Sequence, residues 1–246
     1  SDLAAQELGC RSVAYTYNDP AIFPEYAIDV ATACRELGIR SVAVTAGYMT
    51  PAPRGELFGH MDAANVDLKC FTEDFYHKLC GAQLASILET LVYLRHETTV
   101  WLELTTLLIP GLNDSEREIE EMTQWVVENL GPDVPWHFTA FHPQWKMRDI
   151  PPTPLGTLLR AHAIARSNGV RYAYTGNVRD EAHGATHCHA CHTRLIGRDG
   201  YRITEWNLGP GGTCRSCGTA CAGLFDAEPG TWGARRQPVR LLDYHA

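Results

Sequence analysis

The sequence lacks the features that mark membrane, secreted or nucleic-acid-binding proteins. No run of about eighteen apolar residues occurs, and the first segment, SDLAAQELG, has neither the basic start nor the apolar centre of a signal peptide. Lysine and arginine total 21 against 29 aspartate and glutamate, a formal net charge of −8, and this excess of negative charge disfavours nucleic acid as a partner. We therefore expect a cytoplasmic protein that binds neither membrane nor nucleic acid.

The cysteines argue against a disulfide scaffold. A chain of 246 residues, 45% of them hydrophobic, can build a core without disulfide help. Of nine cysteines, five lie between residues 188 and 221 in short-spaced sets, which is typical of metal ligands in intracellular proteins. The other four, Cys10, Cys34, Cys70 and Cys80, fall in strand or helix patterns and are interpreted as small core residues.

Strand and helix patterns alternate along the first 176 residues. Residues 10–17 alternate apolar and polar side chains, and residues 20–37 follow with helical spacing that stops at Gly38. Further strands are predicted at 39–45, 65–71, 99–109, 134–141 and 170–175, and further helices at 72–79, 85–96, 115–130 and 155–169. Alternation of this kind predicts an α/β fold with six parallel strands, either open or closed into a barrel.

The alternation is lost after Gly176, where a region rich in glycine, cysteine and histidine begins. We predict three parts: a β/α body over residues 1–176, a small module over 177–225, and a tail over 226–246 without readable periodicity.

Four cysteines of the small module have the spacing of a zinc ribbon. Cys188 and Cys191 form one Cys-x2-Cys pair and Cys214 and Cys217 form another, with 22 residues between the pairs. Residues 193–208 between them resemble a hairpin with a glycine at its turn. Two such turns can present four thiolates tetrahedrally, so we predict a structural zinc site, with iron, an iron–sulfur cluster or free thiols as alternatives.

Other possible ligands lie close to these four cysteines. Cys221 is a fifth thiol, and His187, His189 and His192 flank the first pair. Exchange of any of them with a cysteine ligand stays open, but the histidines are more simply read as surface loop residues.

The predicted strand ends are polar, and in parallel β/α proteins the reactive residues lie at the carboxyl ends of strands. The residues concerned are Tyr17, Asn18 and Asp19 after the first strand, Thr45 and Gly47 after the second, Asp67 and Lys69 on the third, and His142 after the fifth. Taken one at a time these residues have simple structural readings. Asp67 and Lys69 share one side of a strand and can form an ion pair, Asn18 and Asp19 can start a helix, and His142 can cap a loop.

Taken together, five segments resemble one family. They are AYTYNDPAIFPEY (14–26), VAVTAGY (42–48), NVDLKCFTEDFYHKLCG (65–81), LELTTLLIPGLNDSE (102–116) and FTAFHP (138–143). In this order they resemble the radical S-adenosylmethionine (SAM) enzymes similar to the pyruvate formate-lyase activating enzyme, in particular the branch called the AmmeMemoRadiSam system radical SAM enzyme. The resemblance covers nearly the whole chain, including the cysteine module.

This resemblance implies a partial (β/α) barrel that holds a [4Fe-4S] cluster, with SAM bound across the strand ends. It implies an oxidoreductase of the activating type that cleaves SAM reductively to a 5′-deoxyadenosyl radical, which abstracts hydrogen from an unknown substrate, possibly a protein. An electron donor is also implied. By motif, Tyr17, Asn18 and Asp19 match the segment that holds the methionine amine of SAM. Thr45, Gly47, Asp67, Lys69 and His142 match further SAM contacts.

The sequence departs from the family pattern at three points. Asp19 stands where the family usually has glutamate, and Ala46 replaces an asparagine. The cluster motif Cys-x3-Cys-x2-Cys does not occur, and the nearest match, at 214, 217 and 221, has the spacing reversed. Because the first residue is Ser1 and the first segment reads as the end of a helix, we expect the cluster ligands upstream of residue 1. These 246 residues alone are then expected to be inactive.

The same residues are compatible with two other functions. An aldolase-like barrel could use Lys69 as a Schiff-base nucleophile, but the neighbouring Asp67 favours the charged ammonium over the free amine that this chemistry needs. A second alternative is a non-catalytic zinc-ribbon interaction protein on a barrel scaffold. The sequence names neither the substrate, the reductant nor the oligomeric state.

Overall fold

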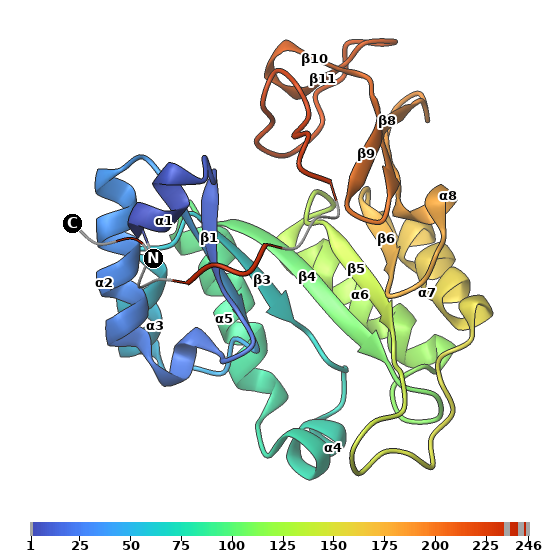
Figure 1. The fold of residues 1–246 in the computed structure, drawn as a ribbon. Helices are drawn as coiled ribbons and strands as arrows, with labels where there is room; N and C mark the ends of the chain where they lie inside the picture. Colours follow the sequence, from blue (N-terminus) through green and yellow to red (C-terminus); the bar gives the residue numbers. More distant parts are fainter. Residues whose placement is uncertain (1, 234–236, 241–243, 245–246) are drawn as a thin grey trace. The chain divides into compact units, whose positions relative to one another are not determined.

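Six parallel strands form one sheet in which the order in space equals the order along the chain. They are β1 (Ser12–Tyr15), β2 (Arg40–Thr45), β3 (Ala63–Asp67), β4 (Trp101–Leu108), β5 (Trp136–Ala140) and β6 (Ala173–Gly176). The structure, a computed structural model, describes residues 2–233, 237–240 and 244 (Figure 1). The predicted α/β fold with six parallel strands is confirmed.

The chain divides into two units, residues 1–105 with 237–246 and residues 106–236. The helices of the first unit are α1 (Asp2–Glu7), α2 (Pro24–Glu36), α3 (Pro51–Phe58), α4 (Glu73–Phe75) and α5 (Leu84–Glu97), with a 3-10 turn η1 (Pro20–Ile22) and a π-helix η2 (Tyr76–Cys80). Helix α2 buries Ala27, Ala31 and Cys34 at helical spacing and contacts β2. The predicted helix over 20–37 is therefore confirmed but is interrupted at Phe23.

Helix α3 was not predicted, because its sequence, PAPRGELF, contains two prolines and a glycine, which have low helix propensity. Pro51 occupies the first helical turn, where the backbone N–H groups have no partner inside the helix and proline costs little. The side chains of Leu57 and Phe58 are buried and attach the helix to the core.

Some sequence predictions in the first unit were wrong in detail. The third strand ends at Asp67 rather than at residue 71, so Lys69 lies beyond the strand. Cys10 and Cys80 are exposed rather than core residues, whereas the other two cysteines of this unit are buried as predicted.

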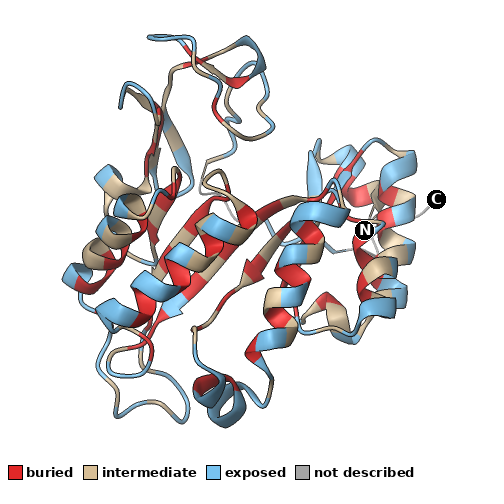
Figure 2. Ribbon diagram, turned by 180° about the vertical axis from the view of Figure 1, so that it is seen from behind, coloured by how far each residue is buried: buried red, intermediate tan, exposed pale blue. Residues whose placement is uncertain are grey.

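The second unit contains helices α6 (Glu116–Leu130), α7 (Leu155–Ser167) and α8 (Glu181–Gly184). Ser115 caps α6, because its hydroxyl accepts a hydrogen bond from the Glu118 backbone N–H at 3.3 Å. The buried apolar residues of α6 recur every three or four positions, and Figure 2 shows buried and exposed stretches alternating along the helix as its faces turn. Helix α7 contacts α6, β5 and β6.

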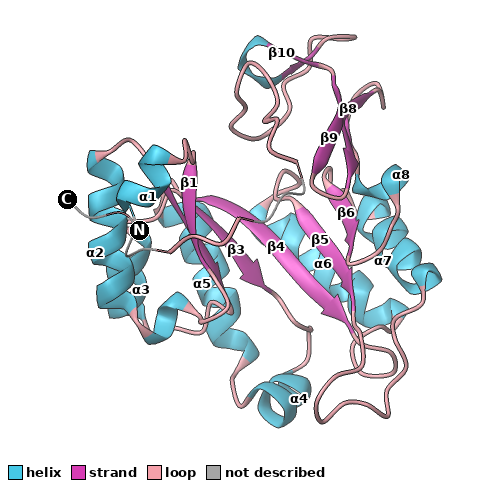
Figure 3. Ribbon diagram, viewed as in Figure 1, coloured by secondary structure: helices cyan, strands magenta, loops and turns pink. Residues whose placement is uncertain are grey.

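The cysteine module contains short antiparallel strands, which Figure 3 draws in magenta. They are β7 (Thr186–His187), β8 (Arg194–Asp199), β9 (Arg202–Trp206), β10 (Leu208–Gly209) and β11 (Thr213–Cys214), followed along the chain by irregular backbone; a 3-10 turn, η3 (Pro210–Gly212), joins β10 to β11. Strands β8 and β9 form the predicted hairpin, and Gly200 at its turn has φ 58°.

The hydrophobic cluster of the module includes Tyr172, which immediately precedes β6, together with Cys188, Leu195 and Leu208. The β/α part of this unit and the cysteine module therefore share a core, and the predicted boundary after residue 176 stays a prediction. None of the helices that the structure describes is both long and apolar enough to cross a membrane.

Candidate functional site

The Asp19 carboxylate joins the loops that follow β1 and β2. Its Oδ1 accepts hydrogen bonds from the Thr45 hydroxyl at 2.7 Å and from the Ala21 backbone N–H at 3.0 Å. Its Oδ2 accepts from the Ala46 N–H at 2.8 Å. The Thr45 hydroxyl in turn accepts from the Gly47 N–H at 3.0 Å. Asp19, Thr45 and Gly47, predicted separately, thus form one hydrogen-bonded group.

Tyr17 and Asn18 present their side chains to solvent just before this group. Tyr17 has φ 68° and its side chain is 100% exposed. A left-handed backbone at a bulky residue costs free energy and persists only where neighbouring contacts impose it. The hydrogen bonds of Asp19, two residues further along, supply such contacts and hold this segment in a defined shape.

Gly47 lies at the end of β2 in a position that only glycine fits. Its φ is 69°, and a Cβ atom placed on it would lie 2.9 Å from the Val66 side chain of the neighbouring strand. The backbone of the β2 end can therefore lie against β3 only in the absence of a side chain.

Gly47→Ala is expected to lower the free energy of unfolding by about 2–4 kcal/mol, the sum of left-handed strain and overpacking. Gly38→Ala is a matched control, because Gly38 also has φ 69° but has no atom near its Cβ position. It is expected to lose about 1–2 kcal/mol, for strain alone. Urea unfolding followed by circular dichroism measures both, and equal losses would show that contact with Val66 has no effect.

Asp67 and Lys69 form the predicted ion pair at the end of β3. The Lys69 Nζ atom lies 2.6 Å from Asp67 Oδ2, and each side chain is more than a third exposed. The contact forms although Lys69 lies beyond the strand. At this exposure the pair contributes little to the free energy of unfolding. It places one positive and one negative group next to each other, both accessible to solvent.

Tyr76, which the sequence did not single out, fixes the backbone next to this pair. Its buried hydroxyl accepts a hydrogen bond from the Lys69 backbone N–H at 2.9 Å, and burial raises the pKa of the phenol. Tyr76 opens the π-helix η2, and such helices are frequent at functional sites. No local pattern in the sequence indicates this contact, since it depends on the irregular helix.

His142 lies in the second unit, directly after β5. Its ring is exposed, and Nε2 lies 3.4 Å from the Asn177 carbonyl oxygen. Asn177 follows β6 with φ 58° and donates through its side chain to the Ala140 carbonyl oxygen. The loops after these two strands are thus linked, and the SAM contact predicted for His142 stays a prediction.

The four cysteines of the module lie together, as predicted. The sulfur atoms of Cys188, Cys191, Cys214 and Cys217 are all within 4.8 Å of one another, and no other group of three or more potential ligands occurs among residues 2–233, 237–240 and 244. Cys188 Sγ lies 3.6 Å from Cys217 Sγ, and Cys191 Sγ lies 3.7 Å from Cys214 Sγ. Tetrahedral bonds of about 2.3 Å to one ion place sulfur atoms about 3.8 Å apart, so this group fits a metal ion.

The two Cys-x2-Cys turns have the same backbone geometry. In each turn the N–H of the first cysteine donates to a threonine carbonyl oxygen, Cys188 to Thr193 at 2.9 Å and Cys214 to Thr219 at 2.8 Å. The second cysteine of each turn donates through its thiol to the hydroxyl of that threonine, at 3.4 and 3.3 Å. These threonines were not predicted as part of the site, although the repeat Cys-x2-Cys-x-Thr is visible in the sequence.

The exposed and the buried thiols of this group differ in pKa. When Cys191 is a thiolate, the hydroxyl and the backbone N–H of Thr193 donate to its sulfur and lower its pKa to about 6, and Thr219 lowers the pKa of Cys217 in the same way. Burial raises the pKa of Cys188 to about 11. Each turn therefore offers one exposed thiol that loses its proton readily, which favours binding of a cation.

Cys221 and the nearby histidines lie outside the four-cysteine group. Cys221 is buried in the hydrophobic cluster of the module, and burial raises the pKa of its thiol. His189 is half-buried with Nδ1 3.3 Å from the Tyr172 hydroxyl, whereas His192 is exposed. The structure gives no support to exchange of these residues with the cysteine ligands.

Comparison with known proteins finds one curated relative. An uncharacterized protein of Methanocaldococcus jannaschii is 36% identical over 210 residues, which represent 85% of this chain and 62% of the relative. The chain therefore spans less than two thirds of that relative's length. No protein-family model matches the chain.

Two solved structures share the fold. A domain of the pyruvate-formate lyase-activating enzyme from Bacteroides vulgatus matches with a TM-score of 0.59 and 18% identity, covering 67% of this chain and 98% of that domain. SuiB of Streptococcus suis bound to S-adenosylmethionine matches with a TM-score of 0.56 and 15% identity, covering 70% of this chain and 41% of SuiB. The chain has the fold of these proteins. The predicted likeness in fold to the activating enzyme is confirmed.

Proposed function

We propose that the chain is the SAM-binding part of a radical SAM enzyme of the glycyl-radical-activating type, in the AmmeMemoRadiSam branch. The observation that carries the proposal is the joined group of Asp19, Thr45 and Gly47 beside the Asp67–Lys69 pair, at the ends of three adjacent parallel strands. A likeness in fold to the activating-enzyme domain and to SuiB supports it.

Each strand end has a chemical role in this proposal. Three hydrogen bonds already engage the Asp19 carboxylate, so its role is to fix the loop, and the backbone and polar side chains of Tyr17 and Asn18 meet the methionine amine. The Lys69 ammonium is suited to the carboxylate of SAM, and Asp67 orients it. Gly47 keeps the β2 end free of a side chain. His142 would meet the adenosine part.

The cluster itself requires ligands that this sequence does not contain. In the enzymes that the motifs resemble, a [4Fe-4S] cluster supplies the electron that cleaves SAM to methionine and the 5′-deoxyadenosyl radical, which takes hydrogen from the substrate. The 246 residues contain no Cys-x3-Cys-x2-Cys string, and the only gathered cysteines among the described residues are the four of the module. These residues thus supply the SAM contacts and not the cluster ligands.

For the four-cysteine group we propose a structural zinc ion. Four thiolates in a closed tetrahedral arrangement suit zinc and leave no position free for a reacting molecule. The ion would therefore stabilise the module rather than take part in the reaction. The substrate is proposed to be a protein or peptide segment, a class that SuiB also accommodates, since it is described bound to the precursor peptide SuiA.

The two alternative functions have less support. A Schiff-base enzyme needs a neutral Lys69 amine, and the Asp67 carboxylate 2.6 Å away stabilises the ammonium instead. A purely structural zinc-ribbon protein would have no need for an exposed ion pair and a strained Tyr17 at neighbouring strand ends.

Production of 5′-deoxyadenosine tests the proposal. The full-length product of the gene, reconstituted anaerobically with iron and sulfide and reduced with dithionite, is expected to release 5′-deoxyadenosine from SAM, measured by liquid chromatography. The 246-residue chain, which lacks the cluster motif, is expected to release none. No product from the full-length protein, with its cluster verified by absorbance spectroscopy, would refute the assignment.

Lys69→Met in the full-length protein is expected to raise the KM for SAM about 10- to 100-fold, because a charged hydrogen bond contributes about 1.5–3 kcal/mol. Lys78→Met is the matched control, since Lys78 forms a similar ion pair with Asp74 at 2.8 Å on the surface of the same unit. An equal KM for both variants would remove Lys69 from the SAM site.

A further inference from the structure

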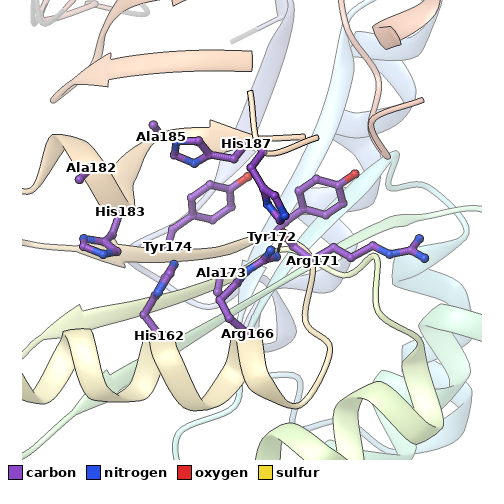
Figure 4. A pocket seen from close by; sticks show the side chains of 11 residues that line it. His162, Arg166, Arg171, Tyr172, Ala173, Tyr174, Ala182, His183, Ala185 and His187 are labelled. Carbon is purple, nitrogen blue, oxygen red and sulfur yellow. Dashed lines mark hydrogen bonds between the residues drawn. The ribbon is translucent and has the colours of Figure 1, made fainter. Parts of the chain in front are cut away.

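A cavity of about 260 Å³ lies within the second unit, apart from every residue assigned to SAM or to the four-cysteine group. Helix α7 contributes His162 and Arg166, which are one turn apart on the same face. Tyr172 and Tyr174 come from the β6 segment, and His183 from α8. Figure 4 shows the imidazole rings of His162 and His183 close together at one end of the cavity.

Arg166 brings a positive charge to the cavity wall that no carboxylate offsets. Its guanidinium donates to the backbone carbonyl oxygens of Val170, at 2.9 Å, and Arg171. Among the described residues it has no acidic partner. The neighbouring Arg171 differs, because its guanidinium is 3.0 Å from Asp133 and is neutralised there.

The two histidines form a fixed pair. Their ring centroids are 4.8 Å apart with the rings nearly perpendicular. Asp180, whose carboxylate also accepts from Thr175, holds His183 Nδ1 at 2.8 Å. This contact orients the ring and directs Nε2 away from Asp180.

The surroundings of the pair disfavour further positive charge. Burial, together with the nearby His183 and Arg166, lowers the pKa of His162 to about 4. Burial opposes the charge of Asp180, but hydrogen bonds from His183 and Thr175 outweigh it and lower the pKa of that carboxyl. A negatively charged ligand would relieve this excess of positive potential, whereas a cation would add to it.

The composition of the cavity excludes other ligands. A metal ion needs at least three converging ligand atoms, and in the part of the chain that the structure describes only the four cysteines provide them. An apolar ligand would remove water from the charged Arg166 guanidinium without adding a polar contact. The residues that line the cavity include two arginines and four histidines and no aspartate or glutamate, which suits an oxyanion.

We propose that this cavity binds the phosphate group of inorganic phosphate or of a small phosphate monoester, with Arg166 supplying the charge and His162 and His183 supplying hydrogen bonds. A planar guanidinium matches phosphate oxygens well. The volume is below that of sites for drug-sized ligands, which begin at about 300 Å³. The bound molecule therefore carries at most a small organic part.

Titration of the full chain with inorganic phosphate tests the proposal. The side chains are labelled with ¹⁵N-histidine, and chloride keeps the ionic strength constant. The imidazole signals of His162 and His183 are expected to shift saturably, and isothermal titration calorimetry gives the affinity. Shifts that grow linearly with phosphate, without saturation, would overturn the proposal.

Two arginine variants test whether Arg166 supplies the positive charge that binds phosphate. Arg166→Gln is expected to weaken phosphate binding about 10- to 100-fold. Arg117→Gln, which removes an exposed arginine paired with Glu121 in the same unit, is expected to change it less than about twofold. Equal weakening in both variants would identify the binding as adventitious and refute the site.

Two further measurements keep the proposal testable if Arg166→Gln does not fold, since that variant loses hydrogen bonds to two carbonyl groups. His183→Asn keeps the helix intact and removes one donor, and it is expected to weaken phosphate binding about tenfold. Acetate, titrated in parallel against the unaltered chain, is expected to bind at least tenfold more weakly than phosphate. Unchanged affinity in His183→Asn, or equal binding of acetate, would overturn the proposal.

Discussion

Replacement of Cys214 by serine is expected to abolish metal binding by the four-cysteine group and to unfold the module around it. Cys214 is buried, and its sulfur is 3.7 Å from that of Cys191 on the opposite turn. A structural zinc ion contributes about 10–16 kcal/mol of binding free energy to small zinc-finger peptides at pH 7, and loss of one of four thiolates removes most of it. The hydrophobic cluster of the module is small and does not replace that contribution.

The metal content of the purified chain measures this effect. Plasma mass spectrometry is expected to find one zinc ion per unaltered chain and less than about a tenth of that in Cys214→Ser. Cys221→Ser is the matched control, because Cys221 is a buried thiol of the same cluster outside the metal group, and it should retain the full amount. Loss of zinc in both variants would mean that Cys221 takes part in binding, and retention in both would remove the assigned ligand set.

Asp19→Ala is expected to lower the free energy of unfolding by about 2–4 kcal/mol. The substitution removes three hydrogen bonds to a carboxylate at once. It leaves two donors without an acceptor, the O–H of Thr45, a residue only 3% exposed, and the Ala46 N–H, and each such loss costs about 1–3 kcal/mol. The two strand-end loops would then separate, so SAM binding by the full-length protein is expected to weaken as well.

Urea unfolding monitored by circular dichroism measures the change in stability. Asp29→Ala, on the exposed surface of α2, serves as the control and is expected to shift the free energy by less than about 0.5 kcal/mol. Asp19→Glu keeps the charge but adds a methylene, and it tests whether the glutamate usual in the family fits this shorter geometry. A neutral effect of Asp19→Ala would show that the loops hold their positions without the carboxylate.

The periodic parts of the fold could be predicted because their signals are local. The strands alternate with period two and the long helices repeat every three or four residues, so all six strands were found. The third strand was extended too far because apolar and polar residues keep alternating beyond Asp67, although the chain has already left the sheet. Helix α3 was not predicted because proline usually indicates the end of a helix, although it costs little free energy in a first turn.

The candidate site could be predicted in its residues but not in its contacts. Asp19 accepts a hydrogen bond from Thr45, which lies 26 positions further along the chain. No local sequence pattern predicts such a long-range hydrogen bond. For the same reason the cavity of the second unit was not predicted, since His162 and His183 meet only because α7 and the short helix α8 converge. The four cysteines were predictable because two close pairs suffice to define the ligand set.

The identical geometry of the two cysteine turns bears on how the module exchanges its ion. Each turn is a two-sulfur chelator, and the 22 residues between Cys191 and Cys214 are a tether folded into a hairpin. When one turn releases a bound ion, the other turn still holds it. The tether keeps the first turn near the ion at an effective concentration on the order of millimolar for short tethers, so rebinding competes with loss of the ion. With zinc bound as proposed, slow exchange would follow from the pairing of two chelating turns rather than from any single ligand.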